Sequence, residues 1–198
     1  MNDAVSPRVA LLETPRLILR PWLDRDREPF ARMSTDSRVM QHLLPFASPE
    51  AIDAWIDRQC AHLEAHGFCF WAIESKADGD FIGAAGLLRV GYEAHFTPAV
   101  EVGWRVAQRF WGQGYAPEAA ACAIRFGFEH VELQEIVANT AAANRNSRRV
   151  MEKLGMSHAA ADEFDHPLVP IENLLRRQVL YRLQRDRWSV RDTTSRSP

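Results

Sequence analysis

The chain is poor in cysteine and has no long apolar run. Its three cysteines, Cys60, Cys69 and Cys122, stand at spacings that match neither a disulfide framework nor a pair of metal ligands. So few thiols favour a reduced, cytoplasmic setting, in which we expect all three to be buried. No apolar stretch approaches the roughly 18 residues of a membrane-spanning helix. We therefore expect no membrane segment and no metal site.

An excess of either charge is also missing. The 198 residues carry 24 Lys and Arg against 26 Asp and Glu, a formal net charge of −2. This balance gives no electrostatic basis for binding nucleic acid or an anionic membrane surface. Hydrophobic residues make up 46% of the chain, which is enough for the core of one soluble domain.

The two ends differ from the middle in composition. Residues 1–12 look like a flexible lead-in, with an acidic Asp3 and without the apolar core of a signal peptide. Residues 186–198 are rich in Asp, Thr, Ser and Pro and are expected to be disordered. Residues 13–185 are then expected to form one domain.

Hydrophobic periodicity divides this domain into alternating strands and helices. An α+β or mixed α/β fold follows, with a mostly antiparallel sheet of about seven strands and helices on both faces. The predicted strands cover residues 16–22, 68–74, 81–90, 100–106, 134–140, 156–160 and 177–183. The predicted helices cover residues 24–35, 49–66 and 117–130, with a fourth that begins at Asn146 or Ser147 and ends at Leu154.

The segment from Val100 to Glu118 organises the rest. Apolar residues alternate through Val106, as in a strand, and a turn containing Gly112 and Gly114 leads into a helix. Glycine lets the backbone turn sharply and approach a ligand. Several N–H groups then converge where the helix dipole is positive, which predicts a site for a phosphate-bearing ligand.

Two motifs make the chain resemble a known family. One is the turn Arg109-x-x-Gly112-x-Gly114-Tyr115-Ala116, and the other runs from Asn144-x-x-Ser147 to Leu154-Gly155. With the order of elements, they resemble the GNAT superfamily of acetyl-CoA-dependent N-acetyltransferases over residues 12–183. The segment from Glu13 to Arg20 resembles the branch that contains ribosomal-protein N-terminal (alanine) acetyltransferases.

This resemblance implies where the acetyl-CoA co-substrate binds. The fourth and fifth strands would splay apart, with the pantetheine arm in the wedge between them and the pyrophosphate on the turn. The implied contacts are Val106, Arg109, Gly112, Gln113, Gly114, Tyr115, Ala116, Asn144 and Ser147.

Acetyl transfer to an amine requires a group that accepts a proton. Glu101 is the best candidate, because strand alternation points it away from its valine neighbours and its surroundings of Val, Gly and Trp should raise its pKa by desolvation. The alternative is a structural carboxylate paired with Arg105 or another arginine.

The resemblance adds two further catalytic candidates. Ser147 would contact the thioester sulfur or act as a weak acid, with helix N-cap as its structural alternative. Tyr181 is the kind of tyrosine that some family members use as the acid.

The acceptor side is expected to be built by loops. His95 and His166 should rim it, and Trp22 and Phe96 should line it, although surface histidines and core aromatics would look the same in sequence. The loop over residues 162–177 is longer than a connection needs and is expected to form a wall that selects the substrate. The sequence leaves open a small-molecule amine or a peptide N-terminus as acceptor, and a monomer or a homodimer.

Two other function classes compete with the enzyme. A non-catalytic acyl-CoA-binding module would keep the turn without using Glu101. A nucleotide-binding phosphotransferase is disfavoured because no Gly-x-x-x-x-Gly-Lys-Ser/Thr motif is present. The leading hypothesis is an N-acetyltransferase that moves the acetyl group to a primary amine by direct attack in a ternary complex.

Overall fold

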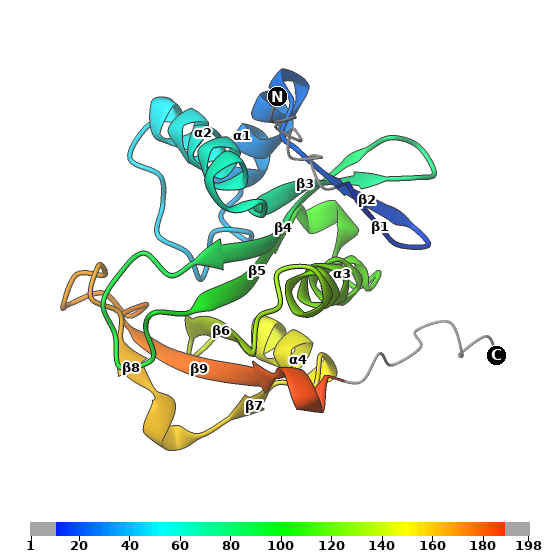
Figure 1. Cartoon of the computed structure of the whole chain (residues 1–198). Helices are drawn as coiled ribbons and strands as arrows, with labels where there is room; N and C mark the ends of the chain where they lie inside the picture. The colour runs from blue at the N-terminus through cyan, green and yellow to red at the C-terminus, as the bar shows by residue number, and fades with distance from the viewer. Residues whose placement is uncertain (1–10, 189–198) are drawn as a thin grey trace, which may run out of the picture.

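The computed structural model describes residues 11–188, in which one mixed sheet carries helices on both faces (Figure 1). The strand order is β1-β2-β3-β4-β5-β6-β9-β7, with β8 paired to β9. The strands are β1 (Leu12–Glu13), β2 (Leu17–Arg20), β3 (Phe70–Ser75), β4 (Phe81–Arg89), β5 (Val100–Val106), β6 (Glu135–Ala141), β7 (Ser157–His158), β8 (Phe164–Asp165) and β9 (Arg177–Gln184). The helices are α1 (Arg27–Thr35), α2 (Pro49–His66), α3 (Tyr115–Glu129) and α4 (Arg145–Lys153).

The expected fold class is confirmed, with nine strands in place of about seven. The two extra strands, β1 and β8, have two residues each, too few to show the period-two pattern that identifies a strand in sequence. The ends of the expected domain also shift. Leu12 and Glu13 already pair with β2, and Trp188 packs on Phe128 with ring centroids 6.0 Å apart. The rest of the expected lead-in and tail lies outside the described residues.

The fourth and fifth predicted strands, β5 and β6, splay apart. β4 and β5 pair along seven register positions, from Gly83↔Val106 to Arg89↔Val100. β5 and β6 run parallel and pair only at Glu101↔Val137. Every other neighbouring pair in the described sheet is antiparallel. The sheet therefore opens into a wedge beyond Glu101.

Helix boundaries follow local capping chemistry. Ser48 caps α2 by accepting the Ala51 N–H at 3.3 Å, and Gly67 ends the helix in the left-handed conformation, so the predicted bounds 49–66 are confirmed. The start of α4 was predicted wrongly: Asn144, not Asn146 or Ser147, is its N-cap. The Asn144 side chain reaches the third helical N–H, which gives it a geometry that a residue inside the helix lacks.

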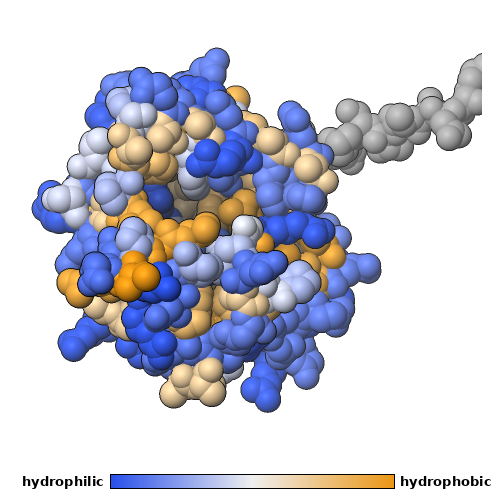
Figure 2. Space-filling model, turned by 90° about the vertical axis from the view of Figure 1, so that its left-hand side faces the viewer, coloured by the Kyte–Doolittle hydropathy of each residue, from blue (hydrophilic) through white to orange (hydrophobic). Residues whose placement is uncertain are grey.

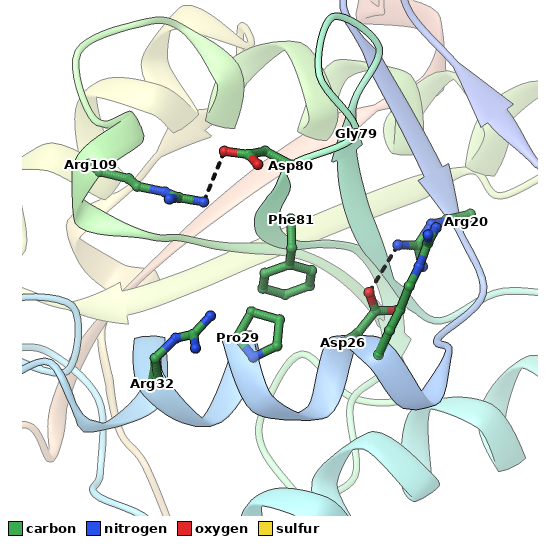
Figure 3. Close-up of a pocket in the computed structure, with 9 residues that line it drawn as sticks. Arg20, Asp26, Pro29, Arg32, Gly79, Asp80, Phe81 and Arg109 are labelled. Carbon is green, nitrogen blue, oxygen red and sulfur yellow. Dashed lines mark hydrogen bonds and ion pairs between the residues drawn. The ribbon is translucent and has the colours of Figure 1, made fainter.

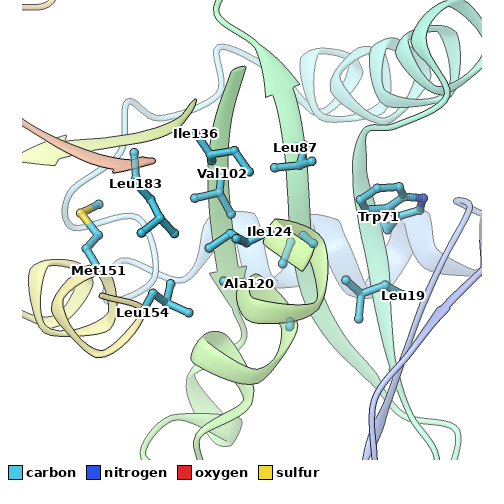
Figure 4. Packing of buried hydrophobic residues seen from close by; sticks show 14 of the residues in the cluster. Leu19, Trp71, Leu87, Val102, Ala120, Ile124, Ile136, Met151, Leu154 and Leu183 are labelled. Carbon is cyan, nitrogen blue, oxygen red and sulfur yellow. The ribbon is translucent and has the colours of Figure 1, made fainter. Parts of the chain in front are cut away.

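Two apolar clusters hold the layers together. On one face α3 packs against β4 and β5, where Ile124 meets Leu87 and Val102 in a core that extends to β9 (Figure 4). On the other face α1 and α2 cover a smaller, aromatic-rich cluster that includes Phe30 and Ile56. Successive strand residues point to opposite faces. Among residues 11–188, no helix is long and apolar enough to cross a membrane.

Candidate active site

The turn before α3 leaves open space beside Gly112 and leads into the first turn of a helix. Gly112 and Gly114 both have φ near 80°, at 77° and 80°, a left-handed conformation that glycine adopts without strain. A Cβ added to Gly112 would meet nothing within 4 Å. The N–H groups of Tyr115 and Ala116 begin the helix and have no intrahelical acceptor. Open space and a positive helix end suit a phosphate group.

The turn is fastened to the start of β2 by Arg16. Its guanidinium donates to Glu118 Oε2 at 2.7 Å and to the Gln113 carbonyl at 2.9 Å. It also lies 4.5 Å from the centroid of the Tyr115 ring. Thr14 donates to the other Glu118 oxygen at 2.6 Å. Sequence reasoning missed this clamp, because no spacing rule links residues about one hundred positions apart.

Arg109 directs its side chain away from the turn. Its guanidinium lies 3.0 Å from Asp80 Oδ2, at the edge of a pocket between α1 and the β3–β4 turn (Figure 3). Gln113 donates to the Arg109 carbonyl at 3.2 Å. Nearby, the Trp111 indole donates to the Val106 carbonyl at 2.7 Å. The predicted contacts of Arg109 and Val106 with acetyl-CoA are therefore limited to backbone groups that these bonds leave free.

Asn144 and Ser147 lie together where β6 ends. The Asn144 amide donates to Ser147 Oγ at 3.0 Å and to Thr140 Oγ1 at 2.9 Å, and its oxygen accepts the Ser147 N–H at 3.2 Å. Both side chains are half-buried. They stand on the β6 side of the wedge, so the structure brings the second predicted motif to the same opening as β5.

Glu101 sits at the single bridge between β5 and β6. Its carboxylate accepts a hydrogen bond from Asn139 Nδ2 at 2.8 Å. Burial among protein atoms raises its pKa to about 7, and the Asn139 hydrogen bond lowers it in part. The side chain still keeps some exposure to solvent. Within residues 11–188 it forms no ion pair, so the structural alternative of pairing with Arg105 does not occur there.

The face of β5 that carries Glu101 is partly open to solvent. Alternation places Gly103 and Arg105 on the same face, and all three keep partial exposure. Phe30, Phe46 and Trp55 surround Arg105. Figure 2 shows the surface hollowed between the upper part of the molecule, formed by α1 and α2, and the lower part, with apolar side chains inside the hollow. We call the partly exposed face of β5 formed by Glu101, Gly103 and Arg105 the β5 cleft.

Three of the predicted acceptor residues gather beside Glu101's face. His95, Phe96 and His166 surround Phe164, with ring centroids 5.1 to 6.2 Å from it. This cluster packs on Val137, the register partner of Glu101. Burial lowers the pKa of His166.

Tyr92 completes the aromatic cluster and was missed in the sequence. Its ring lies 4.2 Å from that of His166. The hydroxyl is buried and has no hydrogen-bond partner among the described residues. Burial raises its pKa, and the nearby Glu101 charge adds to the effect.

Two predicted residues lie elsewhere. Trp22 is 7% exposed and donates its indole N–H to the Phe70 carbonyl at 2.7 Å, so it packs in the buried cluster with Phe30 instead of lining the acceptor side. Tyr181 is 2% exposed and pairs in register with Ala138, on the opposite face of the sheet from Glu101. Its hydroxyl lies 3.1 Å from Glu152 Oε1. The structure does not bring Tyr181 to the proposed base.

The described residues contain no group of three or more His, Cys, Asp or Glu side chains that could hold a metal ion. Their three cysteines are free thiols. Cys69 and Cys122 are buried as expected, whereas Cys60 is only partly buried.

Comparison with known proteins places this chain in a family. The family model described as Acetyltransferase (GNAT) domain matches residues 16–157. The FsC-acetyl coenzyme A-N(2)-transacetylase of Aspergillus fumigatus is 34% identical over 188 residues, which cover 89% of this chain and 77% of that protein.

Two solved structures share the fold. An acetyltransferase from Agrobacterium tumefaciens has a TM-score of 0.71 and 24% identity, covering 93% of this chain and 99% of its own. The spermidine N-acetyltransferase from Vibrio cholerae, solved with CoA and spermine, has a TM-score of 0.70 and 15% identity, covering 88% and 99%. The chain therefore belongs to the GNAT family of N-acetyltransferases.

Proposed function

We propose that this enzyme transfers the acetyl group of acetyl-CoA to a primary amine by direct attack within a ternary complex, with Glu101 as the base. The observation that carries the proposal is the position of Glu101. It is a desolvated carboxylate with a pKa of about 7, located where β5 and β6 begin to diverge. A base with a pKa near the working pH is suited to proton transfer.

The residues present fit acetyl-CoA. The open N–H groups from Gly112 to Ala116 would hold the pyrophosphate, and the edge of β5 near Val106 would pair with the pantetheine arm. Asn144 and Ser147 would contact the ligand from the β6 side. When bound, acetyl-CoA supplies an activated acetyl thioester. Tyr181 is a weaker candidate for the acid, since Glu152 and Arg148 engage its hydroxyl on the other face.

Glu101 has one task in the reaction. A protonated amine must lose a proton before its nitrogen can attack, and the ionised Glu101 takes that proton directly or through water. The nitrogen–carbonyl carbon bond then forms and the carbon–sulfur bond breaks. Backbone N–H groups of β5 would stabilise the negative charge on the carbonyl oxygen. As the amide forms, the nitrogen gives up its second proton to solvent. The released thiolate takes a proton from solvent, and a thiol pKa of about 8.5 makes it a good leaving group.

The names of the relatives support an amine as the acceptor, but they do not single out one particular amine. They include a protein named for spermidine and one named for FsC. A small-molecule amine or a peptide N-terminus fits the site, and the resemblance to ribosomal-protein acetyltransferases stays a prediction. Cysteine usage supports a cytoplasmic enzyme.

Replacement of Glu101 tests the proposal. Glu101→Gln should lower kcat about 100-fold or more, the usual contribution of a general base, and should remove a rise of activity with pH centred near pH 7. Glu129→Gln, at an exposed position on α3, is the matched control. Turnover measured by thiol release should be unchanged in the control.

A thermal shift with acetyl-CoA separates binding from catalysis. Both variants should keep the rise in Tm that the ligand gives the wild type. Unchanged turnover in Glu101→Gln would remove Glu101 from the mechanism. A Tm shift without transfer to any amine would support the non-catalytic acyl-CoA-binding module instead.

A further inference from the structure

Arg105 is a desolvated cation without a carboxylate partner. Its guanidinium lies 5.4 to 5.6 Å from the ring centroids of Phe30, Phe46 and Trp55. Of its five N–H donors, only one makes a contact within residues 11–188, to Ser34 Oγ at 3.4 Å. Burial alone acts on its pKa and lowers it to about 10. A buried charge usually requires an ionic or hydrogen-bonding partner.

Other arginines on the same side of the molecule are paired. Arg20 contacts Asp26 and Glu74 at 2.6 and 2.7 Å, and Arg109 contacts Asp80 at 3.0 Å. The pocket in Figure 3 contains both and thus has its positive charges neutralised by the protein. Arg105 differs because it has no carboxylate partner within residues 11–188, while solvent still reaches part of its side chain.

The floor between Glu101 and Arg105 is apolar. The two residues lie on one face of β5, four positions apart, which places their Cα atoms roughly 13 Å from each other at about 3.3 Å per residue. Gly103 stands between them, and the edge of the Phe70 ring fills the space above it, 2.7 Å from where a Cβ would be. A ligand that spans the two charges would lay its middle part on this ring.

We propose that the acceptor is an amine that also carries a carboxylate, joined by an apolar spacer of several bonds. The amine would lie at Glu101, the spacer on Phe70, and the carboxylate at Arg105. This inference rests on the proposed function of Glu101 and names the substrate class of the same site. Arg105 is then a specificity residue that binds the far end of the substrate. A substrate carboxylate would give the guanidinium the charged partner that no residue in 11–188 provides.

Matched acceptors test the inference. We would measure kcat and KM for 6-aminohexanoate and for 6-aminohexanamide, which differ only in the charge at the far end. Trialanine and its C-terminal amide form a second pair, which separates a peptide carboxylate from an ω-amino acid. The wild type should show a KM about tenfold or more lower for the acid than for the amide, because a charge-assisted pair contributes more than a neutral one.

Two variants assign this preference to Arg105. Arg105→Met, which keeps the length of the side chain, should erase the difference between acid and amide. Arg105→Lys should retain part of it. If Arg105 had only a structural role, its replacement would change kcat and KM for both acceptors of a pair by the same factor. A wild type without preference for the acid, or an Arg105→Met that keeps it, would overturn the inference while leaving the proposed function intact. Absence of transfer to every amine would overturn both.

Discussion

The Glu101–Asn139 pair decides the protonation state of the proposed base. Burial raises the pKa of Glu101 to about 7, and the amide of Asn139, which donates at 2.8 Å, opposes that rise by stabilising the ionised form. Neither effect alone would place the pKa at that value. Asn139 is thus a positioning residue, since it acts on the reaction through Glu101.

Removal of this hydrogen bond gives a signed prediction. Asn139→Ala should raise the pKa of Glu101 further, so the acidic limb of the kcat/KM profile should move to higher pH by about one unit or less. A structural role for Asn139 would lower activity at every pH without moving the limb. The pH profile, measured at saturating acetyl-CoA, distinguishes the two.

Glu101 also makes stability depend on pH. Its folded-state pKa of about 7 lies above the ordinary value of 4.5. As pH rises from 4.5 through 7, the unfolded chain therefore loses this proton before the folded chain does, and stability falls. Glu101→Gln should be more stable than wild type at pH 8 by roughly 1 to 2 kcal/mol, a value reduced because water reaches the side chain. Near pH 4 the two proteins should have the same free energy of unfolding, as measured in urea. A gain in stability of Glu101→Gln that persists at this pH would exclude ionisation as the cause.

At the scale of the element, the turn before α3 is built for close approach by a ligand. Gly112 faces open space, and the ion pair between Arg16 and Glu118 ties the start of α3 to the segment before β2. Arg16 and Glu118 belong to segments with no recognisable sequence relation. Their contact depends on β2 lying beside α3, which only the folded chain provides.

A pair of glycine substitutions isolates the role of the turn. Gly112 and Gly67 share a φ of 77°, and neither has an atom within 4 Å of a built Cβ. Replacement by Ala should therefore strain both backbones equally, at about 1 to 2 kcal/mol each. Only Gly112→Ala should weaken the binding of acetyl-CoA, with a Kd raised about tenfold or more, because its new methyl group would stand where the pyrophosphate approaches. Titration calorimetry would measure the Kd of each variant for acetyl-CoA. Equal Kd values for the two variants would contradict the assignment.

At the scale of the whole molecule, the core beneath the wedge joins its two sides. Since β5 and β6 share one register pair, backbone pairing between them is slight. Ile124 on α3 is fully buried in the cluster that runs from β2 to β9, which is visible in Figure 4. We therefore expect side-chain packing, more than backbone hydrogen bonds, to hold the two halves of the sheet together across the wedge.

Loss of this packing should be costly. Ile124→Ala should lower the free energy of unfolding by about 2 to 5 kcal/mol, the usual range for a buried Ile truncated to Ala. Leu174→Ala, at a side chain 95% exposed, should stay within about 0.5 kcal/mol of the wild type. Denaturant unfolding measures both, and similar values would mean that the core beneath the wedge contributes little.

The sequence alone determined the elements that depend on local chemistry. Ser48, Pro49 and Gly67 fix α2 because capping and backbone preference act over a few residues. The alternation of β5 placed Glu101 opposite its valine neighbours, and the same alternation could have revealed Arg105. The glycine turn gave the family resemblance. Two-residue strands such as β8 carry no period and were not predictable.

Only the tertiary structure decided which of these residues meet. Tyr181 and Glu101 are both on strands, yet the register through β6 puts them on opposite faces. Trp22 does not line the acceptor side as predicted, because it is buried in the cluster that α1 and α2 cover. Arg105 gained three aromatic neighbours and no carboxylate among the described residues. Such contacts depend on packing between segments far apart in the chain, and local propensity carries no information about them.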